Sequence, residues 1–68
     1  MAKMNLKAAR VNVDMTQKEV AKQLNVSNRT LQSWESGKTF PNAEKIDALC
    51  ALYGVTYEDI IFLNNNSL

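Results

Sequence analysis

The sequence predicts one all-α domain, compact and built from five short helices. Apolar residues recur at intervals of three and four along nearly the whole chain, which is the period of a helix, and no stretch alternates as a β-strand does. Residue types that begin or end helices separate these stretches. With 68 residues, 46% of them hydrophobic, the chain has room for one small core. We therefore expect a single domain over residues 1–63 and a flexible polar tail over residues 64–68.

The first predicted helix runs from Met4 to Val13. Leu6, Ala9 and Val13 recur at helical spacing, so they should face the core. Asp14 should end the helix, because aspartate tolerates the left-handed backbone of a helix terminus.

The second predicted helix runs from Gln17 to Leu24, and its start is the best-defined boundary in the chain. Thr16 and Glu19 have the spacing of a capping box, in which each side chain bonds to the backbone N–H of the other residue. Its inward face should carry Val20, Ala21 and Leu24.

The third predicted helix runs from Asn28 to Ser36. Ser27 is a good N-cap, and Gly37 is a typical residue at a helix C-terminus. Asn25 can adopt the positive φ of a tight turn before the helix. Its inward residues should be Leu31 and Trp34.

The last two predicted helices follow the loop that contains Pro41. The fourth should run from Ala43 to Tyr53, and a short fifth helix should run from a Thr56 cap to Phe62. Helical spacing predicts that these two helices bury the side chains of Ile46, Leu49, Cys50, Tyr53, Ile60 and Ile61.

Residues 17–36 together fit a helix-turn-helix, in which two helices cross closely after a sharp turn. A close crossing needs a small residue, and Ala21 stands at that position. The turn needs a residue that tolerates positive φ, and Asn25 stands there. The apolar residues that would hold the two helices together are Val20, Leu24, Val26, Leu31 and Trp34.

Three motifs add a family resemblance. They are Thr-Gln-x-x-x-Ala at 16–21, Trp-Glu-x-Gly at 34–37 and Gly-Val-Thr at 54–56. With them the chain, from Leu6 to Phe62, resembles the phage repressor and Cro family of helix-turn-helix domains, also called the XRE family. The resemblance implies a five-helix, lambda-repressor-like fold that binds double-stranded DNA with helix 28–36 in the major groove. It also implies a repressor- or Cro-like transcriptional regulator of the kind that phages and prophages carry.

The polar face of the third helix is where we expect contacts to DNA. Asparagine and glutamine pair with adenine, and arginine pairs with guanine. The residues expected to contact bases are Asn28, Arg29, Gln32 and Ser33. The residues expected to contact the sugar-phosphate backbone are Gln17, Ser27, Ser36, Lys38 and Thr39.

Two further roles follow from the resemblance alone. Gln17 should brace Asn28 as well as contact the backbone of DNA. Arg10 and Glu35 match a pair that forms an internal salt bridge in some members, in which case Arg10 is structural.

Lys7 and Lys18 could add phosphate contacts or serve only solubility.

The net charge of +1 conceals an uneven distribution. Residues 1–38 contain seven basic and three acidic residues, whereas residues 39–68 contain one basic and four acidic residues. A basic half can face a polyanion while the whole chain stays nearly neutral.

The composition argues against an enzyme. The chain has no histidine and one cysteine, Cys50, and it shows no glycine-rich phosphate loop and no plausible carboxylate pair. We therefore expect no cofactor, no metal and no small-molecule ligand. Without an apolar run of membrane length or a secretory signal, we expect a cytoplasmic protein that does not enter membranes.

The partners expected are DNA and a second copy of the chain. One small module reads too few base pairs to select a single site, so a homodimer, formed in solution or only on DNA, should bind two half-sites. Its contact patch should include Phe40, Tyr57, Ile61 and Phe62. An alternative stays open, in which the same fold is a protein-interaction module or an antitoxin-type partner protein.

Overall fold

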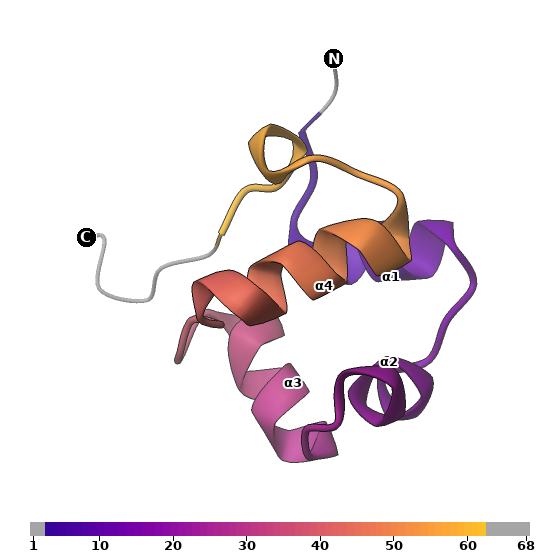
Figure 1. Ribbon diagram of the computed structural model, residues 1–68, viewed down its shortest axis with the longest axis vertical. Coiled ribbons are helices and arrows are strands. Elements are labelled where there is room, and N and C mark those ends of the chain that lie inside the picture. The colour runs from indigo at the N-terminus through magenta and orange to yellow at the C-terminus, as the bar shows by residue number, and fades with distance from the viewer. Residues whose placement is uncertain (1–2, 63–68) are drawn as a thin grey trace.

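The computed structural model describes residues 3–62, and in this range four α-helices surround one core (Figure 1). The helices α2 and α3 lie together at one end of the molecule, while the N-terminal segment and the 3-10 turn η1 lie at the other end. The helix α4 packs against α1 and α2. The elements are α1 (Leu6–Asn12), α2 (Gln17–Leu24), α3 (Asn28–Ser36), α4 (Ala43–Tyr53) and η1 (Tyr57–Asp59).

Side-chain caps fix the start of every α-helix in this part of the chain. In each case the cap oxygen accepts a hydrogen bond from the backbone N–H three residues later, at 2.8–3.1 Å. The capping box predicted for α2 is present, because the Thr16 N–H also donates to Glu19 Oε1 at 2.8 Å. The four capping residues are Asn5, Thr16, Ser27 and Asn42.

The turns after the helices use the left-handed backbone that the sequence predicts. Asp14 and Asn25 have φ of 58° and 57°, and Gly37 and Gly54 have φ of 85° and 69°. Aspartate and asparagine can take this conformation because their short polar side chains bond locally. The predicted boundaries of α2, α3 and α4 are therefore confirmed.

The first helix is shorter than predicted. It begins at Leu6 because Asn5 caps it, and Val13 is exposed rather than buried. Met4 is extended and pairs with Ile60 in an isolated parallel bridge. In this bridge the Met4 N–H donates to the Asp59 carbonyl at 2.9 Å, and the Ile61 N–H donates to the Met4 carbonyl at 2.8 Å.

The short fifth helix predicted up to Phe62 is not confirmed. The chain makes only the three-residue 3-10 turn η1 and is extended at Ile60, with φ −103° and ψ 132°. In an extended chain successive side chains point to opposite sides. Ile60 is accordingly buried, at 8% exposure, whereas Ile61 is 49% exposed. The tail predicted over residues 64–68, and residue 63 before it, lie outside the described residues.

The core contains one apolar side of each α-helix. Leu31, Leu49 and Val20 are the largest fully buried side chains. Ile46 and Cys50, which the spacing also assigned to the core, are only partly buried. The remaining buried apolar residues are Leu6, Ala9, Ala21, Leu24, Trp34, Tyr53 and Ile60.

Tyr53 gives the core a pH-dependent group. Its side chain is buried, and its hydroxyl finds no hydrogen-bond partner among the described residues. Burial, and secondly the Glu35 carboxylate, raise the pKa of Tyr53 from 10 to about 12, although Arg10 acts in the opposite direction. Between these values the unfolded chain loses the phenol proton while the folded chain keeps it, so stability falls as pH rises.

We expect Tyr53→Phe to reduce the loss of folding stability at alkaline pH, because phenylalanine has no proton to release. At pH 7 the variant should be as stable as the parent or more stable by up to about 1 kcal/mol, since an unpartnered buried hydroxyl is removed. Urea denaturation at pH 7, 9 and 11 measures both effects. Tyr57→Phe, at an exposed position, is the control and should leave the alkaline fall in place. If the free energy of unfolding fell equally between pH 7 and 11 in the parent and in Tyr53→Phe, Tyr53 would not be the group responsible.

Candidate nucleic-acid interface

The helices α2 and α3 form a rigid pair because of the turn between them. Asn25 takes the left-handed conformation, and the Val26 N–H donates to the Ala21 carbonyl at 3.0 Å, which closes the end of α2. Ala21 is buried, and its small side chain suits the close approach of the two helices. The predicted helix-turn-helix over residues 17–36 is thus present.

A lysine from α4 supports the same turn. Lys45 Nζ donates to the Leu24 carbonyl at 2.8 Å, so a cation caps the negative end of α2. This contact joins residues that are 21 positions apart. Sequence reasoning missed it, since Lys45 carries no local pattern that distinguishes it from a solvated lysine.

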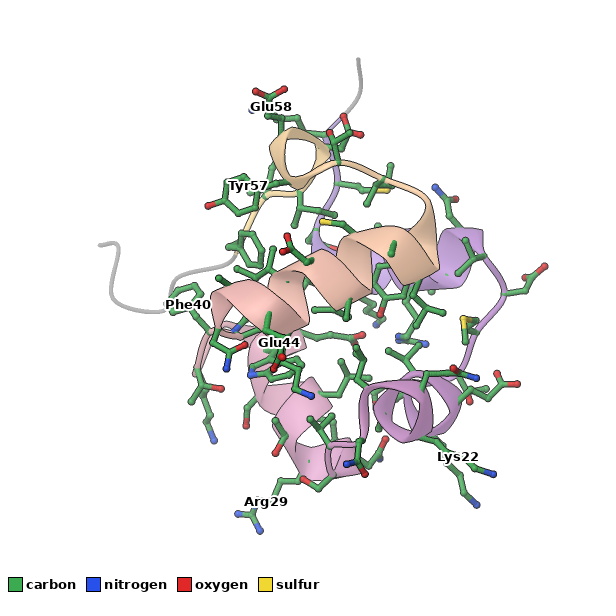
Figure 2. All side chains as sticks on the ribbon, viewed as in Figure 1. Lys22, Arg29, Phe40, Glu44, Tyr57 and Glu58 are labelled. Carbon is green, nitrogen blue, oxygen red and sulfur yellow. The ribbon has the colours of Figure 1, made fainter. Side chains whose placement is uncertain are left out.

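The outer face of α3 is polar and accessible. Leu31 and Trp34 are buried, which turns the opposite side of the helix toward solvent. Arg29 extends away from the body of the protein at the N-terminal end of α3 (Figure 2). A shallow groove runs along this face and is lined by Asn28, Arg29, Gln32, Ser33, Ser36 and Lys38.

A second hollow adjoins this groove at Asn28, which lines both. It lies at the N-terminus of α2, where unpaired backbone N–H groups favour an anion. Gln17 and Lys18 are among its lining residues, together with Thr16 and Arg10. The two hollows therefore lie next to each other on the surface that α2 and α3 form.

All four residues predicted to contact bases therefore lie on one groove. Asn28, Arg29 and Gln32 are exposed, and Ser33 is partly buried. None of them is needed to fill the core. The face has the amide, guanidinium and hydroxyl groups that can form hydrogen bonds with the edges of bases.

The residues predicted to contact phosphates fall into two groups. Gln17 is the first residue of α2, and Ser27 caps the N-terminus of α3, where its Oγ accepts from the Thr30 N–H at 3.0 Å. Ser36, Lys38 and Thr39 lie at its C-terminus and are exposed. The N–H groups of Lys38 and Thr39 both donate to the Ser33 carbonyl, at 3.0 and 3.4 Å, which holds the loop close to the helix.

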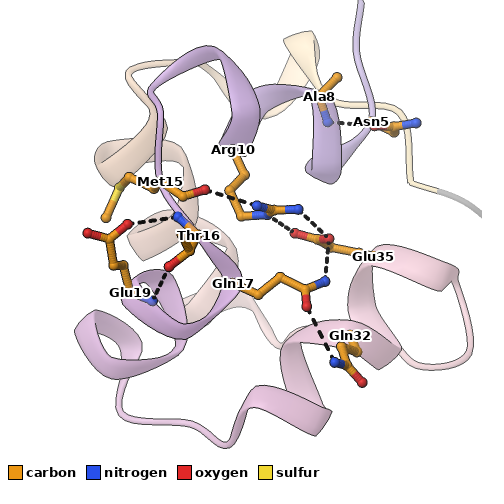
Figure 3. Close-up of polar contacts among 9 residues, drawn as sticks. All are labelled: Asn5, Ala8, Arg10, Met15, Thr16, Gln17, Glu19, Gln32 and Glu35. Carbon is orange, nitrogen blue, oxygen red and sulfur yellow. Dashed lines mark hydrogen bonds and ion pairs between the residues drawn. The ribbon is translucent and has the colours of Figure 1, made fainter.

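Arg10 and Glu35 form a buried ion pair (Figure 3). Arg10 Nε donates to Glu35 Oε2 at 2.7 Å and Arg10 Nη2 donates to Glu35 Oε1 at 3.3 Å. Arg10 Nη1 donates to the Met15 carbonyl at 2.9 Å. Both side chains are almost fully buried. Arg10 is therefore structural, as the resemblance implied, and it joins α1 to α3.

Gln17 links this ion pair to the groove. Its Nε2 donates to Glu35 Oε1 at 2.9 Å, and its Oε1 accepts from Gln32 Nε2 at 3.3 Å. The resemblance implied that Gln17 braces Asn28; the residues of α3 to which it is hydrogen-bonded are instead Gln32 and Glu35, one and two helical turns further along. The crossing of α2 and α3 brings Gln32, rather than the first residue of α3, opposite Gln17.

Charge is distributed unevenly over the surface. Arg29 and Lys22 lie at the α2–α3 end, and Glu58 lies at the opposite end (Figure 2). Figure 2 places Glu44 between them, on α4. The basic half of the sequence thus supplies the charged side chains around the groove.

Other kinds of site find little support in residues 3–62. No helix in this range is long and apolar enough to cross a membrane, and no group of three or more histidine, cysteine, aspartate or glutamate side chains could hold a metal. Burial, followed by the charges of Asp47 and Asp59, raises the pKa of the Cys50 thiol. Its thiolate is therefore scarce at neutral pH, so Cys50 is a poor nucleophile.

Comparison with known proteins agrees with this geometry. The chain is 34% identical over 56 residues to an HTH-type transcriptional activator, BcrR, of Enterococcus faecalis, a match that covers 82% of the chain and 28% of that protein. It is 35% identical over 57 residues to the antitoxin PezA of Streptococcus pneumoniae, covering 84% of the chain and 36% of that protein. The chain thus spans about a third of each relative or less. A family model described as helix-turn-helix matches residues 6–60. The chain belongs to this helix-turn-helix family, the XRE family that its motifs resemble.

Proposed function

We propose that this protein is a transcriptional regulator that binds a specific sequence in double-stranded DNA, with α3 in the major groove. The observation that carries the proposal is the polar groove along α3. Because Leu31 and Trp34 on the opposite side of the helix are buried, this groove faces solvent. Its base-reading residues are Asn28, Arg29, Gln32 and Ser33. The match to a transcriptional activator supports the regulatory role.

Phosphate contacts on both sides of α3 would set its position in the groove. Gln17 at the start of α2 and Ser27 at the start of α3 could contact the phosphates of one DNA strand. Ser36, Lys38 and Thr39, at the C-terminal end of α3, could contact those of the other strand. Such contacts give affinity without sequence preference. The base contacts then decide which sequence is bound.

Two substitutions separate these roles. Arg29→Ala should weaken binding to the preferred sequence by about 1–3 kcal/mol and relax selection at one base pair, because an arginine–guanine contact is lost. Lys38→Ala should weaken binding to all sequences alike, because one phosphate contact is lost. The slope of the logarithm of the binding constant against the logarithm of the salt concentration should become shallower by roughly one unit. Selection of bound duplexes from a random pool, followed by titrations at several salt concentrations, measures both.

Lys22→Ala is the matched control for charge, since Lys22 is exposed on α2 but lines neither hollow. It should change neither the preferred sequence nor the affinity at moderate salt. If Arg29→Ala and Lys38→Ala behave identically, the division into base-reading and phosphate-contacting residues is wrong.

The same regulator is proposed to bind as a repressor- or Cro-like homodimer. An apolar patch is defined by Phe40 in the loop after α3, Tyr57 in η1, and Ile61 and Phe62 just after η1; Figure 2 shows Phe40 and Tyr57. The Phe62 ring centroid is 6.4 Å from that of Phe40 and 5.8 Å from that of Tyr57. Phe40 is 54% exposed and Tyr57 is 61% exposed, so large apolar surfaces face solvent. Exposed apolar clusters of this kind are typical of protein contacts.

Phe40→Ser should abolish cooperative binding to two half-sites while binding to one half-site stays unchanged. The side chain is mostly exposed, so the melting temperature should change little. Analytical ultracentrifugation of protein with DNA of one or two half-sites measures the stoichiometry and cooperativity. Val13→Ser, at an exposed apolar residue outside the patch, is the control. Full cooperativity in Phe40→Ser would exclude this patch as the dimer contact.

The match to an antitoxin supports a second candidate, in which the same domain also serves as the DNA-binding part of an antitoxin-type protein. The polar α3 face argues against a module that binds only proteins through that surface. Retention on random duplex DNA that is lost steeply as salt rises would support DNA binding in either role. Retention that does not respond to salt would favour the protein-interaction alternative.

A further inference from the structure

A continuous chain of hydrogen bonds leads from the buried ion pair to the groove (Figure 3). It starts at Arg10, passes through the Glu35 carboxylate and the Gln17 amide, and ends at Gln32. Glu35 is buried, Gln17 is partly buried and Gln32 is exposed on α3. The interior is therefore connected directly to one of the proposed base-reading side chains.

The donors and acceptors along this series of hydrogen bonds have a fixed order. An arginine side chain only donates hydrogen bonds, and a carboxylate paired with it only accepts them. Gln17 must therefore turn its amide nitrogen toward Glu35 and its oxygen toward Gln32. That oxygen can be met only by the amide nitrogen of Gln32, which is the contact at 3.3 Å. The ion pair thus sets the orientation of both amides, and rotating either one would place like groups against each other.

Gln32 keeps a usable hydrogen-bonding edge in this orientation. The contact with Gln17 takes one of its two N–H groups, and its Oε1 and the other N–H stay free for a ligand. In the major groove adenine presents an acceptor at N7 and a donor at its amino group, which match this N–H and this oxygen. An amide turned the other way would face the amino group of adenine with its own N–H.

We propose that Arg10, Glu35 and Gln17 are positioning residues that hold Gln32 as a reader of adenine. This inference rests on the proposed function, because it assumes that α3 enters the major groove. The inference goes beyond the proposed function because it makes the base preference of Gln32 depend on a buried ion pair. None of the three positioning residues needs to contact a base.

The first test is Gln17→Met, which keeps the length of the side chain and removes both amide contacts. Binding is measured on duplexes that carry each of the four bases at every position of the selected site, and Gln32→Ala identifies the position that Gln32 reads. The parent should prefer adenine there by roughly 5- to 150-fold, the range of a good bidentate contact, and both variants should reduce the preference to below about threefold. The positions read by Arg29 and Asn28 should keep their preferences.

Loss of a phosphate contact by Gln17 would lower binding to all duplexes equally, and so it cannot mimic a change at one position. Gln23→Met, an exposed residue on the same helix, is the matched control and should leave every preference unchanged. If Gln17→Met keeps the adenine preference that Gln32→Ala removes, the proposal is overturned.

The second test removes the fixed order of donors and acceptors without changing Gln17 or Gln32. In the double variant Arg10→Met with Glu35→Gln, the new amide at position 35 can donate or accept, so Gln17 and Gln32 are free to turn over. The adenine preference should fall at the Gln32 position alone, in a protein whose melting curve shows that it is folded. A preserved preference in the folded variant would overturn the proposal. If the parent itself prefers no base anywhere on the duplex, the proposed function fails first, and that outcome is visible before any variant is made.

Discussion

Glu35→Leu is expected to lower the free energy of unfolding by about 3–5 kcal/mol, because it leaves Arg10 charged and buried without its partner. Arg10 would keep only its bond to the Met15 carbonyl. A domain of this size has a total stability of roughly 3–10 kcal/mol. The loss is therefore a large share of the whole stability, and the variant should unfold at a much lower urea concentration than the parent. Urea denaturation followed by circular dichroism and by Trp34 fluorescence measures the loss.

The double variant Arg10→Met with Glu35→Leu should recover most of this loss. Replacing both members of a buried pair with apolar residues removes the unpaired charge and is often neutral or stabilising. Glu44→Leu, an exposed glutamate on α4, is the control for the change of residue type and should shift stability by less than about 0.5 kcal/mol. A double variant as unstable as Glu35→Leu would mean that the pair is not the reason for the effect.

The part of the fold that sequence predicts well is the part that local rules determine. The boundaries of α2 and α3 follow from the Thr16 and Ser27 caps and from the turn at Asn25, all of which depend on residues a few positions apart. The outward face of α3 follows from the helical spacing of Leu31 and Trp34. The groove could therefore be assigned to the correct residues before its shape was known.

The errors arise where distant segments meet. Thr56 and Asp59 have the spacing of a cap, and they do begin a helical turn. The turn does not continue because Ile60 pairs with Met4, from the other end of the described chain, and takes an extended conformation. No local pattern encodes that pairing. The contact of Gln17 with Gln32 was missed for the same reason, since it depends on how α2 and α3 cross.

Leu31→Ala tests whether α3 is oriented as proposed. Leu31 is fully buried, so the truncation should leave a cavity and cost about 2–5 kcal/mol. Alanine favours helix more than leucine does, so the loss would come from packing and not from the helix itself. The melting temperature should fall by more than about 10 °C, given that each kcal/mol shifts a domain of this size by about 4–8 °C. Differential scanning calorimetry measures the shift.

Binding of DNA should then fail in Leu31→Ala for a different reason than in Arg29→Ala. The destabilised protein should bind all duplexes more weakly in proportion to its unfolded fraction, with its base preferences intact, and an osmolyte such as trimethylamine N-oxide should restore binding by favouring the folded state. Arg29→Ala should keep its melting temperature and lose one base preference that no osmolyte restores. If Leu31→Ala instead changed the preferred sequence while it melted like the parent, Leu31 would have to face the duplex, and the residues on the opposite side of α3 could not read it.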